Sequence, residues 1–246
     1  MTEDTIARIN GTAGPLFLPC PRRTALVCWA GIIGTVSLIM MLLTWLAFEA
    51  SAQINLVKWI VPSVVVGLFV SDVGSGFLHW LFDTCFDDSP WFPRAVGIAA
   101  EHHAHPNLIL AYGFRDYAGF SSIPALLAVT PLATALALSD VPRVPKFAGL
   151  ILCATVLTCF LFAGYGHALG HRWGRTRGIR ALQRMHILLS PRHHRKHHAG
   201  RHDTYYCALF GWTNYLCDNL RIWRALELVT TFITGRNVGP RSYPAE

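Results

Sequence analysis

The sequence predicts an all-α, multi-pass membrane protein with about four transmembrane helices and a cytosolic, histidine-rich helical cap. Two observations indicate this class. Apolar residues make up 52% of the 246-residue chain and charged residues only 14%, whereas soluble domains usually carry about 25% charged residues. The apolar residues gather in long runs, and polar segments rich in histidine separate and follow these runs.

Four apolar runs are long enough to cross a bilayer, which takes about 20 residues of helix. We expect the spans at about 24–50, 57–82, 120–139 and 147–169. The third run contains Pro124 and Pro131, which predict a kink or a partly re-entrant segment. The predicted domain covers 24–235, with cap segments 83–118 and 170–235 and with tails 1–23 and 236–246.

The distribution of basic residues predicts the orientation of the chain. Nine of the 21 Lys and Arg lie between Arg172 and Arg201, directly after the fourth span. Because cytosolic flanks are enriched in basic residues, both termini and the 83–118 segment are predicted to be cytosolic. All 12 histidines then fall on the cytosolic side. The net charge of +7 is assigned to the membrane surface and not to nucleic acid, since no nucleic-acid recognition motif accompanies it.

The second span carries the first polar stripe. Asp72, Gly76, His79 and Asp83 are spaced 4, 3 and 4, which places them on one face of a helix. A carboxylate facing lipid at the bilayer centre costs about 2.5–3.5 kcal/mol, so Asp72 is expected to face the protein interior. Its predicted role is to orient an imidazole, and the alternative is a hydrogen bond between helices.

Histidines recur at metal-ligand spacing along the rest of the chain. His102 and His103 lie in a segment with three histidines in four residues, and His167 and His171 form an i, i+4 pair at the end of the fourth span. The strongest signal is the segment 190–198, where Ser190 is a plausible N-cap and Pro191 a suitable first helical residue. It presents two i, i+4 pairs, His193 with His197 and His194 with His198.

This histidine helix also has a simpler interpretation. Arg192, Arg195 and Lys196 could bind lipid phosphates without any histidine. Phosphate binding alone does not explain four histidines in six residues, because neutral imidazole carries no charge. Metal binding explains them better, with the three basic side chains holding the lipid head group.

The number of imidazoles indicates which metal they hold. Imidazole suits zinc, copper, iron and nickel, and a structural zinc site needs only four ligands. Two ions with several imidazoles each account better for 12 histidines. Redox-active iron is favoured, because a site at the membrane face can oxidise lipid chains, which zinc cannot do.

These motifs resemble the plasmanylethanolamine desaturase family of lipid desaturases, to which the plant phosphatidylglycerol desaturases are related. The resemblance runs from about Ser71 to Gly235. It rests on these matching residues: Ser71-Asp72, Ser75-Gly76, His79-Trp80, Asp83-Thr84, Glu101-His102-His103, Pro106, His167-x-x-x-His171, Pro191-Arg192-x-His194-x-x-His197-His198, Thr204-Tyr205-x-Cys207, Gly211-Trp212-x-Asn214 and Trp223-Arg224.

The resemblance implies an O2-dependent desaturase with two Fe ions that acts on an alkyl-ether chain (making a plasmalogen vinyl ether) or an acyl chain of a phospholipid. It also implies a separate electron donor of the cytochrome b5 or ferredoxin type. The implied metal ligands are His79, His102, His103, His167, His171, His194, His197 and His198, followed in second rank by His186, His193 and His202. Supporting carboxylates are expected at Asp72, Asp83, Glu101 and Asp203.

One segment departs from the family pattern. Animal members carry a histidine–aspartate pair where this chain has Phe114-Arg115-Asp116-Tyr117, and His105 stands where they carry an acid. This difference concerns the choice between ether and acyl chains more than the reaction class. Three alternatives stay open: a di-iron lipid hydroxylase, a non-enzymatic membrane metal-binding or signalling protein, and a zinc hydrolase acting on a lipid head group.

Overall fold

The computed structural model describes residues 22–85, 101–199 and 201–240, and every regular element within these ranges is a helix. Four helices are long and apolar enough to cross a membrane. They are α2 (Arg22–Ala52), α3 (Ile60–Thr84, entered through the 3-10 turn η1, Ile54–Trp59), α5 (Phe114–Leu138) and α6 (Arg143–Gly170). The predicted all-α class with four helices that could cross a membrane is confirmed, and the helix ends differ from the predicted bounds by up to six residues.

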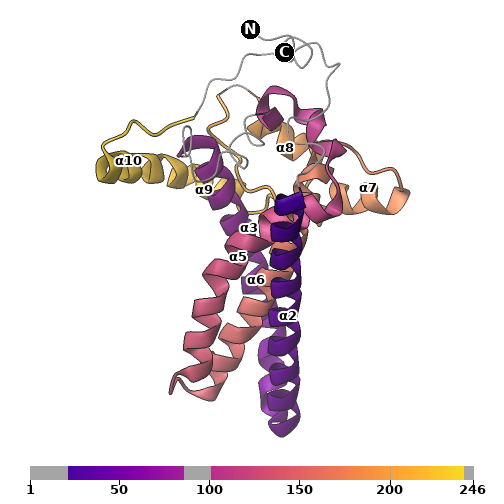
Figure 1. Cartoon of the computed structure of the whole chain (residues 1–246), viewed down its shortest axis with the longest axis vertical. Helices are drawn as coiled ribbons and strands as arrows, with labels where there is room; N and C mark the ends of the chain where they lie inside the picture. The colour runs from indigo at the N-terminus through magenta and orange to yellow at the C-terminus, as the bar shows by residue number, and fades with distance from the viewer. Residues whose placement is uncertain (1–21, 86–100, 200, 241–246) are drawn as a thin grey trace.

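The four spans form one elongated bundle, with the link between α5 and α6 at the end far from the cap (Figure 1). Helix α6 packs against each of the other three spans. Its most apolar window is 50% buried, against 22–28% for the others, so it is the central helix. Phe147, Leu150 and Leu157 of α6 are among the most buried side chains of the core.

Helices α2 and α5 approach closely because Gly119 leaves room for Cys28. A Cβ atom on Gly119 would lie 2.4 Å from the Cβ of Cys28. Small residues at such crossings are typical of helix packing in membranes. Helix α5 continues through Pro124 and Pro131, so the predicted span is a single helix and not a re-entrant segment.

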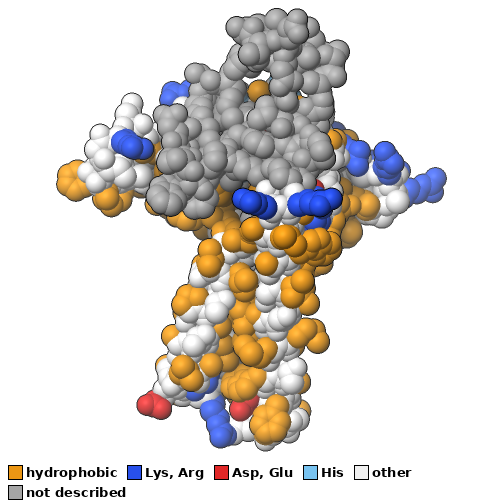
Figure 2. All heavy atoms as spheres, viewed as in Figure 1, with side chains coloured by type: hydrophobic (Ala, Val, Ile, Leu, Met, Phe, Trp, Pro, Cys, Tyr) orange, Lys and Arg blue, Asp and Glu red, His pale blue; other side chains and the backbone are white. Residues whose placement is uncertain are grey.

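The outer surface of the bundle is apolar along its length (Figure 2). Exposed side chains such as Leu26, Phe48, Val61 and Leu127 project from it. Exposure of so much apolar surface to water is unfavourable, so this surface is suited to contact with lipid.

The shorter helices form a cap at one end of the bundle, where α3 and α6 end (Figure 1). They are η2 (Pro106–Ala111), α7 (Arg177–Arg184), α8 (Pro191–His197), α9 (Asn214–Asn219) and α10 (Ile222–Thr234). Helix α8 begins as predicted, because the Ser190 hydroxyl accepts a hydrogen bond from the backbone N–H of His193 at 3.2 Å and Pro191 follows. The predicted tails 1–23 and 236–246 lie mostly outside the described residues.

Candidate metal centre

Ten side chains with metal-binding atoms converge where α3, α6, α8 and the helical residues 101–104 meet. Within each group of such side chains, one ligand atom per residue lies within 4.8 Å of the others. The five-histidine group consists of His102, His167, His171, His194 and His198. The aspartate group consists of His79, Asp83, His103 and His197, and His202 forms a further group with His103 and His198.

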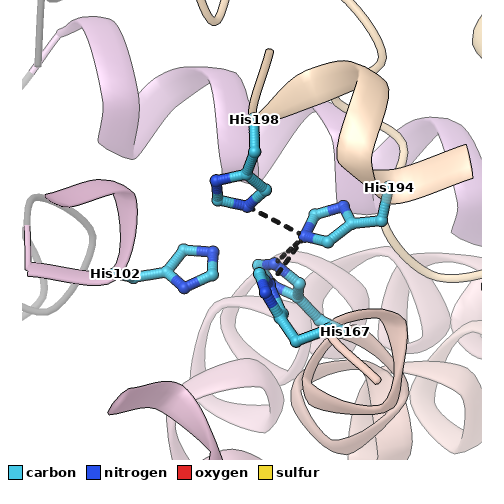
Figure 3. Close-up of side chains that lie close together, drawn as sticks. His102, His167, His194 and His198 are labelled. Carbon is cyan, nitrogen blue, oxygen red and sulfur yellow. Dashed lines mark hydrogen bonds between the residues drawn. The ribbon is translucent and has the colours of Figure 1, made fainter. Parts of the chain in front are cut away.

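In the five-histidine group, the rings from α6, α8 and the 101–104 segment point toward one another (Figure 3). Nε2 of His194 lies 2.9 Å from Nε2 of His167, 2.9 Å from Nε2 of His171 and 3.1 Å from Nε2 of His198. One ring nitrogen carries either a proton or a lone pair, so hydrogen bonding satisfies at most one of these three contacts. A cation that accepts a lone pair from every ring satisfies all of them.

The spacing also fits a metal ion. With metal–nitrogen bonds of about 2.0–2.1 Å, two nitrogens bound at right angles lie about 2.9 Å apart. His102 adds a second indication, because both of its ring nitrogens are buried without a hydrogen-bond partner among the described residues. Buried polar atoms normally have a partner, and an ion would provide one.

The aspartate group is built around one carboxylate oxygen. Oδ2 of Asp83 lies 3.3 Å from Nε2 of His79, 3.0 Å from Nε2 of His103 and 3.4 Å from Nε2 of His197. The carboxylate therefore has the reach of a direct ligand, whereas the sequence predicted a supporting role for it. A mixed set of imidazoles and one carboxylate is suited to iron and related divalent metals.

Two backbone carbonyls orient imidazoles of the aspartate group. Nδ1 of His79 donates to the carbonyl oxygen of Tyr206 at 3.0 Å, and Nδ1 of His197 donates to the carbonyl oxygen of Thr204 at 2.8 Å. Because Nδ1 holds the proton in each ring, Nε2 presents its lone pair to the group. The segment 204–206 thus positions two ligands although none of its own side chains is one of them.

Burial keeps the cap imidazoles neutral. It lowers the pKa of His102 and His194 well below the usual value, and neighbouring imidazoles add to this effect. The pKa of His171 is lowered to about 3 and that of His202 to about 4, again mainly by burial, and the pKa of His198 is lowered for the same reason. Neutral rings keep a free lone pair at pH 7, as metal binding requires.

An apolar cavity of about 210 Å³ leads from the bundle to the histidines. Its walls come from α3, α5 and α6 and include Leu78, Tyr117, Phe160 and Ala163. His79, Asp83, His102 and His167 also line the cavity, so both metal-binding groups face it. The sequence does not distinguish the apolar wall residues as functional, because they have the same character as ordinary core residues.

Asp72 does not contact an imidazole through its carboxylate hydrogen bonds. Oδ1 accepts from the backbone N–H groups of Phe210 and Gly211 at 2.8 and 2.9 Å, and Oδ2 accepts from the N–H and hydroxyl of Thr213 at 2.9 and 2.8 Å. The predicted role of Asp72 as an imidazole orienter is replaced by another role. It ties the segment 210–213, which follows the ligand-orienting residues 204–206, to α3.

Several other predicted residues lie outside the two groups. Nε2 of His193 faces the side-chain amide of Asn214 at 3.2 Å, and the rings of His186 and His193 meet edge to face with centroids 5.7 Å apart. Glu101 accepts a hydrogen bond from the Tyr112 hydroxyl at 3.3 Å.

The remaining predicted residues lie on the surface of the cap. Asp203 pairs with Arg201 at 3.5 Å. Arg192 and Arg195 are exposed on α8, whereas the Lys196 ammonium donates to the hydroxyls of Tyr205 and Tyr215 at 3.1 and 3.2 Å. Lys196 is thus engaged by two tyrosines, whereas the two arginines project into the surroundings of the cap.

The fold and the site together define a multi-pass membrane protein with histidine groups that could hold metal at one end of its spans. The chain belongs to the lipid desaturase domain family, whose model matches residues 68–242. This match confirms the resemblance drawn from the motifs. No solved structure matches the chain.

Curated relatives carry desaturase names. Plasmanylethanolamine desaturase 1 of Mus musculus is 28% identical over 84% of this chain and 77% of its own length. Plasmanylethanolamine desaturase of Myxococcus xanthus is 29% identical over 72% of this chain, and chloroplastic fatty acid desaturase 4 of Arabidopsis thaliana is 31% identical over 72%. The chain spans only 63% and 53% of the length of these last two proteins.

Proposed function

We propose that this chain is an O2-dependent di-iron lipid desaturase that introduces a double bond into an alkyl-ether or acyl chain of a membrane phospholipid. The observation that carries the proposal is the position of the two metal-binding groups at the end of an apolar cavity between the spans. The names of the relatives include both ether-lipid and fatty-acid desaturases, which supports the reaction class and leaves both chain types as substrates.

The donor atoms suit a pair of irons. Both groups offer several imidazoles, one includes a carboxylate, and neither includes a thiolate. Two irons would supply the redox chemistry for removing two hydrogens from an unactivated chain. O2 would be reduced to two waters with those two hydrogens, two electrons from a cytochrome b5 or ferredoxin-type donor and two protons. The closed set of ligands expected for structural zinc accounts less well for two adjacent groups.

The residues of the chain position the substrate and the ligands. Leu78, Phe160 and Ala163 form an apolar wall that excludes water and holds a hydrocarbon chain against His79 and His167. We assign the lipid phosphate to exposed Arg192 and Arg195, which lie on the same short helix as the ligands. The excess of basic residues after α6 supports a cytosolic location for this end of the bundle.

The decisive experiment combines metal analysis with lipidomics. Because two imidazole-rich groups lie side by side, the purified chain should contain about two irons. Cells that express it should gain vinyl ethers or new acyl double bonds. His194 belongs to the five-histidine group and His197 to the aspartate group. His194→Ala and His197→Ala should each abolish the product. His193→Ala is the matched control on the same helix, because its ring faces Asn214, and it should retain iron and product.

The outcomes separate the alternatives. A product heavier by one oxygen would replace desaturation with hydroxylation. Bound metal without any lipid product would indicate a sensor, and one zinc without iron would favour a hydrolase. Product that persists in both ligand variants would contradict the site itself.

A further inference from the structure

Helix α10 carries an apolar stripe that the chain itself does not cover. Leu228, Val229, Phe232 and Ile233 are each more than half exposed, and the last two reach 89% and 74%. Together with exposed Ala225, they follow the i, i+3, i+4, i+7 pattern of one helical face. The opposite face contains Trp223 and Glu227, both of which are buried.

The start of α10 is fixed near the cap end of α3. A Cβ atom on Gly76 would lie 2.8 Å from Cη2 of Trp223, and Trp80 and Trp223 share one buried cluster. Gly76 precedes Thr84, the last residue of α3, by eight residues, or about 12 Å of helix axis. Helix α10 therefore begins at the base of the cap, beside the last turns of α3.

The orientation of α10 relative to the spans directs its apolar stripe toward the span end of the molecule. Figure 1 shows α10 extending sideways from the bundle, roughly perpendicular to the spans. In Figure 2, apolar side chains lie along the edge of this arm that faces the span end of the molecule. Exposed Arg221 and Arg236 stand at the two ends of the helix, where they could meet anionic head groups.

We propose that α10 is an interfacial anchor that lies flat in the head-group region of the bilayer that the spans cross, with Leu228, Val229, Phe232 and Ile233 inserted among the acyl chains. The apolar stripe continues the lipid-facing surface of the spans around the corner onto the cap. Amphipathic helices of this kind insert about 5–10 Å into the boundary between head groups and chains. This role goes beyond the proposed catalysis and does not depend on any metal.

A photo-crosslinking experiment on the full chain tests the anchor. A benzophenone amino acid replaces Phe232 in one variant and Thr234 in a matched control, because Thr234 is also exposed but lies about 200° around the same helix. Both proteins are reconstituted in vesicles of phosphatidylcholine containing a minority of phosphatidylglycerol, irradiated and analysed by mass. Phospholipid adducts are expected at position 232, with none above background at position 234.

Each other outcome overturns the proposal. Crosslinks from position 232 to a second copy of the chain would identify the stripe as a dimer interface. The irradiation is also repeated in native membranes. Crosslinks from position 232 to another protein there would identify the stripe as a binding site for that protein. Absence of any adduct at position 232 would place the stripe in water, and equal lipid adducts at both positions would contradict the orientation of the helix.

Discussion

Asp72→Asn tests the role that the structure assigns to the most deeply placed acid of α3. The Asp72 side chain is 0% exposed, and four donors surround its two oxygens. Asparagine keeps the shape but replaces one oxygen with an NH2 group, which cannot accept a hydrogen bond. The N–H of Thr213 then loses its acceptor, while Phe210 and Gly211 keep a neutral one.

The cost follows from these bonds. A buried donor left unsatisfied costs about 1–3 kcal/mol, and two charge-assisted bonds that become neutral lose about 1 kcal/mol each. The sum is about 3–5 kcal/mol of stability. For a chain of this size, about 2–4 °C is lost per kcal/mol, so the melting temperature should fall by roughly 6 to 20 °C.

The assay is thermal unfolding in detergent, measured on metal-loaded protein and again after chelation. Because the four hydrogen bonds of Asp72 involve no metal ligand, the decrease should persist in the chelated protein. Asp140→Asn, in the exposed link between α5 and α6, is the control and should change stability by no more than about 0.5 kcal/mol. A decrease that vanishes on chelation would show that Asp72 acts through the metal and would refute this reasoning.

Three further predictions concern the site. Asp83→Asn should remove the ion of the aspartate group and abolish the product, while the five-histidine group keeps its ion. Elemental analysis checks the metal content, which should not change in the surface control Asp203→Asn. Ala163→Phe should fill the cavity and lower product formation at least about tenfold, a loss of about 1.4 kcal/mol in chain binding, with metal content intact. Combined Arg192→Ala and Arg195→Ala should raise KM for lipid roughly fivefold per arginine, since each contact with an anionic surface contributes about 1 kcal/mol; a KM that does not change would move the head group elsewhere.

The spans were predictable because hydropathy and length are local properties of the sequence. The start of α5 was harder to predict, because its polar first turn around Asp116 belongs to the helix although it precedes the apolar run. The two prolines predicted a kink or a partly re-entrant segment, and α5 is one helix through both of them. Proline removes one backbone donor, and within a packed bundle the helix tolerates this.

The candidate site was predictable where ligands recur at helical spacing, as in His194 with His198. The same rule also selected His193 with His197, yet only one ring of that pair enters a metal-binding group. The reason is a tertiary contact: the side-chain amide of Asn214, 21 residues further along the chain, lies 3.2 Å from Nε2 of His193. The family resemblance gave His202 only a second rank, yet its ring lies with His103 and His198. Its position depends on a left-handed backbone (φ 55°), which no periodicity indicates.

The origin of the ligands explains how the cap and the bundle depend on each other. In the five-histidine group, α6 supplies His167, whereas in the aspartate group α3 supplies His79 and Asp83. Helix α8 and the 101–104 segment supply ligands to both groups. Ions in the two groups would therefore join α3 to α6 through the cap. Because only His79, Asp83 and His167 come from the spans, the cap must pack correctly before either group is complete.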